Sequence, residues 1–183
     1  MSVLAFQSHN HPQQVRKMGG PNDMVDDRGT RPEIFDPLHA EFGFTLDVAA
    51  AAHNAKVPRF FDRAADGLSL PWRNERVWCN PPFSDLKTWA HKAYTETQLG
   101  GCPLVVMLLP NNRCEQVWWQ DIIEPRRDRV GTGITVRFLK GRPRFQIPAN
   151  VVVPHKGDRP PFGLCVVVFE PSKLPLDIFG DLV

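Results

Sequence analysis

The sequence has few cysteines, and they stand too far apart to form a metal-binding cluster. The four are Cys79, Cys102, Cys114 and Cys165, and no two of them make a C-x-x-C pair. A zinc site needs clustered thiolates and imidazoles, so we expect no metal. Three of the four lie in or beside apolar runs, which is typical of buried free thiols in a reducing compartment.

The sequence also lacks a long apolar run. No stretch reaches the length of about 18 residues that a membrane helix requires, and the N-terminus has no apolar core typical of a signal peptide. We therefore expect a cytoplasmic protein with no membrane partner. The net charge of +2 is mildly basic, which permits a nucleic-acid partner but does not demand one.

The length and the patterning of the chain predict one structured domain. Residues 1–29 are polar and show no sustained periodicity, so we predict a flexible N-terminal arm. Residues 30–183 are predicted to form a single domain. Within it, apolar runs alternate with helical patterns, which predicts an α/β fold whose middle strands are parallel.

Three segments have the pattern of helices. The first covers residues 30–42 with Thr30 as its N-cap, and it should end at the glycine that follows. The second covers residues 84–99 and begins with Ser84, a good N-cap residue. The third is expected around residues 114–123.

Five segments have the pattern of strands, and a sixth, at residues 57–61, has it weakly. The five are residues 44–50, 76–79, 103–110, 134–140 and 163–170. The run at 103–110 does not alternate, which is typical of a strand covered on both faces. Residues 149–161 are interpreted as a connecting loop.

An amide, two prolines and an aromatic ring directly follow the predicted strand at residues 76–79, in the stretch VWCNPPFS. In an open α/β sheet, ligands bind outside the carboxyl ends of the strands. Asp47 falls at the end of another predicted strand. If the two strands are neighbours, the Asn80 amide, the Phe83 ring and the Asp47 carboxyl group converge on one crevice.

The residue types at this position suit an exocyclic amino group. The amine of an aromatic base is a poor nucleophile, because its lone pair is delocalised into the ring. The side-chain oxygen of Asn80 and the carbonyl of Pro81 can each accept one amine hydrogen, which frees the lone pair. Phe83 can stack on the base, a contact worth about 1–3 kcal/mol. The site is therefore predicted to hold an amino group while a methyl group is transferred to it.

NPPF closely matches the Asn/Asp-Pro-Pro-Tyr/Phe signature of amino-group methyltransferases that use S-adenosylmethionine. Further blocks stand around it in order: TRPEIFDPLHAEFGFTLDVAAAAHNAK, DGLSLPWRNERVWCNPPFS, VVMLLPNNRCEQVWW, RFLKGRPRF and FGLCVVVFEP. Over residues 30–171 the chain resembles the phage-type DNA adenine-N6 methyltransferases of the Dam family. The resemblance implies a Rossmann-like class I methyltransferase sandwich, with a mostly parallel central sheet flanked by helices.

The resemblance also implies roles for individual residues. The catalytic motif, which would receive a flipped adenine, is Asn80, Pro81, Pro82 and Phe83. The residues implied for binding of the donor, S-adenosylmethionine, are Thr30, Pro32, Phe35, Asp47, Val48, Ala49 and Asp66. Among them, the Asp47 carboxylate would pair with the donor's ammonium group, and Asp66 is preferred to Asp62 for its adenine or ribose. The block at residues 138–142 would help to form the target-base pocket.

Four basic residues near the predicted site are candidates for contact with DNA phosphates: Arg113, Lys140, Arg142 and Arg144. A second basic cluster at residues 126–129 is a weaker candidate, because Asp128 interrupts it. One feature departs from many methyltransferases: the loop AAAAHNAK after the first donor-binding strand has no glycine. No specific backbone contact to the donor can therefore be assigned there.

The sequence thus predicts a site-specific enzyme that transfers a methyl group from S-adenosylmethionine to N6 of adenine in double-stranded DNA, without a metal. Two alternatives stay open. The same tetrapeptide serves methylation of amino groups in RNA and of glutamine in proteins, and a non-catalytic DNA-binding relative is also conceivable. The recognition sequence, the biological role (protection from restriction, or another) and the oligomeric state, monomer or weak dimer, are left undetermined.

Overall fold

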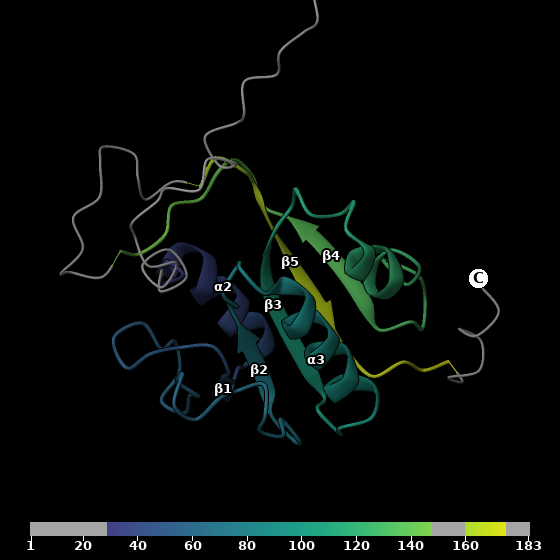
Figure 1. Cartoon of the computed structure of the whole chain (residues 1–183), viewed down its shortest axis with the longest axis horizontal. Coiled ribbons are helices and arrows are strands. Elements are labelled where there is room, and N and C mark those ends of the chain that lie inside the picture. Colours follow the sequence, from purple (N-terminus) through teal and green to yellow (C-terminus); the bar gives the residue numbers. More distant parts are fainter. Residues whose placement is uncertain (1–28, 148–159, 175–183) are drawn as a thin grey trace, which may run out of the picture.

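A computed structural model describes residues 29–147 and 160–174 of the chain. In this part of the chain, five strands form one sheet in the order β1-β2-β3-β5-β4 (Figure 1). The strands are β1 (Leu46–Asp47), β2 (Arg76–Cys79), β3 (Leu104–Pro110), β4 (Ile134–Phe138) and β5 (Leu164–Phe169). They confirm the predicted α/β, Rossmann-like class.

The sheet is mixed, because one strand runs against the others. β1, β2 and β3 pair in parallel, whereas β5 is antiparallel to both of its neighbours, β3 and β4. β5 is therefore the exception to the prediction of parallel middle strands. All of its residues are buried, and a run of buried apolar residues has the same pattern in either direction. The pattern predicts such a strand but not its orientation.

Each face of the sheet is covered by helical structure (Figure 1). The helix α2 (Pro32–Phe42) covers one face through Phe35 and Leu38. The helix α3 (Leu86–Gln98) and the short π-helix η1 (Trp119–Ile123) cover the other. Every residue of β3 is buried, which confirms the prediction that this strand is covered on both faces.

The two long helices lie where the sequence predicts them, but their N-caps differ from the prediction. The N-cap of α2 is Arg31 and not Thr30. The N-cap of α3 is Asp85 and not Ser84, and its carboxylate accepts hydrogen bonds from the backbone N–H (3.4 Å) and the hydroxyl (2.7 Å) of Thr88. Aspartate and serine cap helices about equally well, so the sequence did not separate these two neighbours.

Several predicted elements are shorter than expected. The strand predicted at residues 44–50 is reduced to β1 (Leu46–Asp47), and the one predicted at 134–140 ends at Phe138. The helix expected around residues 114–123 is reduced to η1. The side-chain amide of Gln120 donates to the carbonyl of Cys114 (2.6 Å) and so occupies a group that a longer helix would use internally. The weak strand predicted at residues 57–61 is one isolated bridge, in which Phe60 lies opposite Asp47.

Several predictions concern residues outside the described part of the chain. These are the arm, except for Gly29, and most of the loop at 149–161. Across 29–147 and 160–174, no helix combines the length and the apolar character that crossing a membrane would require. All four cysteines are free, and three of them (Cys79, Cys102 and Cys165) are buried, as the apolar sequence around them predicts.

Candidate functional site

β1 and β2 are neighbours in the sheet, and they bring Asp47 and Asn80 together. Asp47 ends β1 and is paired with Trp78 of β2. Asn80 follows the last residue of β2. Both side chains line one crevice, whose other lining residues are Gly29, Thr30, Ala49, Asn54, Lys56 and Trp78. The crevice volume is about 10 Å³, roughly the space of one water molecule.

The carboxyl group of Asp47 is buried with only partial compensation of its charge. Its Oδ2 accepts a hydrogen bond from the backbone N–H of Lys56 (3.0 Å), and its Oδ1 accepts one from that of Ala49 (3.4 Å). Burial raises the pKa of Asp47 from 3.8 to about 6, although these two bonds and the Lys56 charge oppose the rise. A cationic group placed in the crevice would stabilise the ionised form.

Two more polar atoms are buried in the wall of the crevice. The side-chain oxygens of Thr30 and Asn80 each expose less than 1 Å². The Thr30 hydroxyl has no hydrogen-bond partner among the residues that the structure describes. A buried polar group without a partner costs about 1–3 kcal/mol. The crevice wall therefore favours a ligand that brings hydrogen-bonding groups.

Phe83, three residues after Asn80, belongs to a second and larger cavity. Its ring is half-buried and lies edge-on to Phe145 (5.9 Å between centroids) and tilted to Phe162 (6.0 Å). Together with Arg113, Gln116 and the residues that open α3, Phe83 lines a cavity of about 370 Å³. The tetrapeptide therefore connects a small crevice at Asn80 to a larger hollow at Phe83.

The residues predicted to bind the donor are only partly brought together. Thr30, Asp47 and Ala49 line the crevice. Pro32 and Phe35 do not line it, because Pro32 is exposed in the first turn of α2 and Phe35 points into the core beneath that helix. Contact of these two residues with a donor stays a prediction.

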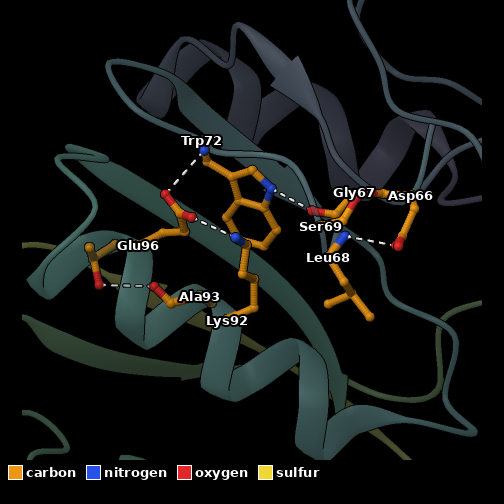
Figure 2. Close-up of polar contacts among 9 residues, drawn as sticks. Asp66, Gly67, Leu68, Ser69, Trp72, Lys92, Ala93 and Glu96 are labelled. Atoms are coloured by element: carbon orange, nitrogen blue, oxygen red, sulfur yellow. Dashed lines mark hydrogen bonds and ion pairs between the residues drawn. The ribbon is translucent and has the colours of Figure 1, made fainter.

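Asp66, also predicted to bind the donor, belongs to a turn (Figure 2) that packs against Val48, another residue predicted to bind the donor. Asp66 is exposed with a φ of 53°, and its Oδ1 accepts a hydrogen bond from the N–H of Leu68 (3.2 Å). Gly67 lies so near the buried Val48 that a Cβ at Gly67 would stand 2.2 Å from the Val48 carbonyl oxygen. The indole N–H of Trp72 donates to the Gly67 carbonyl (2.8 Å) and holds the turn in place.

Glu96 of α3 anchors Trp72 in turn (Figure 2). Its Oε2 accepts a hydrogen bond from the backbone N–H of Trp72 (3.0 Å), and its Oε1 pairs with Lys92 (2.6 Å). The Lys92 ammonium also lies over the Trp72 ring, 5.6 Å from its centroid. The sequence analysis gave Glu96 no role. The available signal was the i, i+4 spacing of Lys92 and Glu96.

The basic residues predicted to contact DNA lie on two loops. Arg113 lines the larger cavity together with Phe83. The other three follow β4, at Lys140, Arg142 and Arg144. The next residue, Phe145, packs on Phe83, so both loops reach the tetrapeptide.

The block predicted for the target-base pocket, residues 138–142, lies at the end of β4. Its first residue, Phe138, is 59% exposed, and Gly141 makes a turn with a φ of 74°. None of these residues lines the small crevice at Asn80 or the larger cavity at Phe83. Their part in the base pocket stays a prediction.

Cys79, the cysteine beside the tetrapeptide, is expected to be unreactive. Cys79 is fully buried, and burial raises its pKa well above the usual value. A thiol that stays protonated is neither a good nucleophile nor a good metal ligand. Across 29–147 and 160–174, no group of three or more His, Cys, Asp or Glu side chains is placed to hold a metal ion. The predicted absence of a metal stays a prediction.

The sequence analysis predicted no role for four residues around the crevice: Gly29, Asn54, Lys56 and Gln146. Gly29 and Gln146 exchange two backbone hydrogen bonds (2.9 and 2.8 Å). The Lys56 ammonium donates to the side-chain oxygen of Gln146 (3.2 Å). These contacts join parts of the chain that are far apart in sequence, which no local pattern predicts.

Known proteins similar to this chain share one description. The family model described as DNA N-6-adenine-methyltransferase (Dam) matches residues 20–181. A protein of Haemophilus phage HP1 named DNA N-6-adenine-methyltransferase is 31% identical over 65 residues, which cover 36% of this chain and 38% of that protein. A protein of the same name from Escherichia phage T1 is 31% identical over 100 residues, which cover 52% of this chain and 41% of that protein. The chain thus spans less than half the length of these two relatives.

Two solved structures are similar to the chain at low identity. One is the crystal structure of a proposed RNA methyltransferase from Pyrococcus horikoshii, with 13% identity, a TM-score of 0.39 and coverage of 70% of this chain and 61% of that chain. The other is a proposed methyltransferase from Thermoplasma acidophilum, with 11% identity, a TM-score of 0.37 and coverage of 79% and 66%.

Proposed function

Because this chain belongs to the DNA N-6-adenine-methyltransferase (Dam) family, we propose that it transfers a methyl group from S-adenosylmethionine to the N6 amino group of adenine in double-stranded DNA. One observation carries the proposal: Asn80 and Asp47 line the same crevice. An acceptor for the amine therefore lies beside an acid that suits the donor. The names of the two phage relatives support DNA as the substrate. They also suggest a phage or prophage source, with the bacterial cytoplasm as its place of action.

The residue types that line the crevice suit the amino-acid end of S-adenosylmethionine. Asp47 is 2% exposed, and burial raises its pKa more than the nearby Lys56 charge lowers it. The donor's ammonium group would supply a further positive charge, and the buried Thr30 hydroxyl would gain a polar neighbour. When bound, S-adenosylmethionine supplies an electrophilic methyl group on a sulfonium. The residues then act mainly by positioning.

The tetrapeptide would hold the acceptor base. The side-chain oxygen of Asn80 and the carbonyl of Pro81 accept the two hydrogens of the N6 amine, which keeps its lone pair out of the ring system. Phe83 stacks on the base at the edge of the larger cavity. Extrusion of a base costs a few kcal/mol, and stacking returns about 1–3 kcal/mol of this. Arg113, which lines the same cavity, would neutralise a nearby phosphate.

Substitution of Asn80 tests the proposal. In Asn80→Ala, methyl transfer from labelled donor to unmethylated duplex DNA should fall at least about a hundredfold, because one preorganised hydrogen-bond partner of the reacting group is lost. Binding of S-adenosylhomocysteine, measured by calorimetry, should stay nearly intact. The matched control is Asn112→Ala, an exposed amide outside both cavities, which should keep full activity.

The same assay separates the remaining acceptors. Structured RNA and protein are offered to the wild-type enzyme beside duplex DNA, and sequencing that detects modified bases identifies the methylated base. If labelled methyl groups appear in RNA or in glutamine but not in DNA, the acceptor is not adenine in DNA, but the protein is still an amino-group methyltransferase. Retention of most activity by Asn80→Ala would contradict the catalytic assignment, and absence of any donor binding would leave a non-catalytic relative.

A further inference from the structure

Two short segments from distant parts of the chain meet beside the small crevice, and the first of them contributes Gly29 and Thr30 to its wall. The N–H of Gly29 donates to the carbonyl of Gln146 (2.9 Å), and the N–H of Gln146 donates to the carbonyl of Gly29 (2.8 Å). The Arg31 Nε donates to the carbonyl of Phe145 (3.3 Å). We name these residues, 29–31 and 145–146, the strap.

The strap contacts the site proposed for the donor. Gly29 and Thr30 line the crevice. The side-chain oxygen of Gln146 accepts a hydrogen bond from the Lys56 ammonium (3.2 Å), and the backbone N–H of Lys56 donates to the Asp47 carboxylate (3.0 Å). Movement of Gln146 would therefore affect the walls of the crevice and the surroundings of its acid.

The strap also contacts the site proposed for the base. Phe145 is 4% exposed, and its ring lies edge-on to Phe83 at 5.9 Å. Arg142 and Arg144 precede it on the segment that leaves β4 and runs toward α2 (Figure 1). Two adjacent residues of the strap therefore contact the two proposed sites, Phe145 the base side and Gln146 the donor side.

The size of the crevice indicates that the strap moves. A volume of about 10 Å³ does not admit a molecule as large as S-adenosylmethionine. Three of the walls, Asp47, Trp78 and Asn80, lie on strands of the sheet or directly after one. The strap belongs to no helix and to no strand of the sheet. The packing of Phe145, the two-bond bridge and the side-chain bonds from Arg31 and Lys56 hold it, so it is the wall that can move without breaking the sheet.

We propose that Phe145 and Gln146 are positioning residues that couple donor binding to DNA binding. The inference rests on the proposed function. Contact of DNA with Phe83 and with the arginines before Phe145 holds the strap down over the donor. Because coupling is reciprocal, a bound donor then raises the affinity for DNA by the same factor.

Calorimetric titration of the full chain with S-adenosylhomocysteine, with and without unmethylated duplex DNA, tests the coupling. In the wild type, DNA should tighten the binding at least about fivefold. Gln146→Pro removes the N–H that bonds Gly29 and should bring this factor close to one. The matched comparison is Gln146→Ala, which keeps both backbone bonds and loses only the side-chain bond to Lys56, so it should retain more of the factor than Gln146→Pro does. Thermal unfolding shows whether each variant is folded.

A second variant tests the coupling if Gln146→Pro fails to fold. Phe145→Leu leaves the backbone bridge in place and shortens the contact with Phe83. In this variant, DNA should no longer tighten the binding of S-adenosylhomocysteine. Without DNA, the variant should bind S-adenosylhomocysteine as tightly as the wild type does. The inference is overturned if DNA tightens the binding of S-adenosylhomocysteine by the wild-type factor in both Gln146→Pro and Phe145→Leu. It is also overturned if all three variants lose this tightening equally.

The outcomes also separate the inference from the proposed function. A wild-type protein that binds no S-adenosylhomocysteine contradicts the proposed function, and the coupling falls with it. A wild-type protein that binds S-adenosylhomocysteine and methylates DNA, but binds the former equally well with and without DNA, contradicts the coupling alone.

Discussion

Asp47 is a carboxyl group buried without a full counter-charge. Burial raises its pKa from 3.8 to about 6. Since the folded-state pKa lies above the unfolded-state value, the folded protein binds the proton more tightly. The contribution of this group to stability is therefore greatest below pH 4 and falls as the pH rises to about 6. The loss amounts to about 3 kcal/mol, and a cationic ligand beside Asp47 would recover part of it.

This electrostatic imbalance predicts a pH-dependent affinity for the donor. Binding of S-adenosylhomocysteine should tighten about tenfold between pH 5 and pH 7, because Asp47 loses its proton over this range and then attracts the ligand's ammonium group. Asp47→Asn should bind more weakly and show almost no slope. Calorimetry across this pH range provides the measurement.

The control for the pH experiment is Asp62→Asn, an exposed acid outside the crevice. It should keep the wild-type slope. An equal slope in Asp47→Asn and in the wild type would show that a different group titrates, and it would remove Asp47 from the proposed donor site.

Among the structural elements, the turn at Asp66 owes its position to α3 (Figure 2). The turn is itself neither helix nor strand. It is held through Trp72, which bonds the Gly67 carbonyl with its indole N–H and the Glu96 carboxylate with its backbone N–H. Glu96 is 6% exposed, so its bonds are protected from water. Any role of Asp66 toward the donor therefore depends on a helix that does not line the crevice.

Substitutions at Glu96 should show how much its bond to Trp72 and its ion pair with Lys92 each contribute to stability. Glu96→Ala leaves the Trp72 N–H buried without an acceptor, and the free energy of unfolding should fall by about 1–3 kcal/mol. Glu96→Gln keeps an acceptor and loses only the ion pair with Lys92, so the decrease should be smaller. Urea denaturation provides the comparison, and Lys92→Met is the control for the ion pair. Equal destabilisation by Ala and Gln would show that the bond to Trp72 contributes little.

For the whole molecule, a net charge of +2 means that attraction to DNA depends on where the basic residues lie. One group follows β4 and leads into the strap, and it contains Arg142. The other follows η1, where Arg127 pairs with Glu124 (2.8 Å). Because that pair already neutralises part of the second group, we expect the first group to carry most of the contact with phosphates.

Salt dependence distinguishes the two groups. The logarithm of DNA affinity falls linearly with the logarithm of salt concentration, and each phosphate contact contributes about one to the slope. Arg142→Ala should therefore reduce the slope by about one, whereas Arg129→Ala, in the group after η1, should leave it unchanged. Fluorescence anisotropy at several salt concentrations measures both. If Arg129→Ala reduces the slope and Arg142→Ala does not, DNA binds on the side of the molecule that carries η1.

Local patterns in the sequence predicted the elements and the central motif of this protein. β2 has the predicted bounds, and α2 ends at Gly43, whose φ of 59° is easily adopted only by glycine. Asn80 and Asp47 were placed at the ends of two strands for the same reason. Periodicity, capping residues and strand ends are properties of neighbouring residues, so the sequence alone determines them.

Tertiary structure alone decided the direction of β5 and the size of the crevice. It also decided two contacts that hold the site, the bridge between Gly29 and Gln146 and the bond between Glu96 and Trp72. The bridge between Gly29 and Gln146 joins distant parts of the chain, and Glu96 reaches Trp72 from another element. The raised pKa of Asp47 depends on the residues that bury it. Each of these features is set by how the elements pack together, and a local pattern of residue types does not encode which distant segment will lie against it.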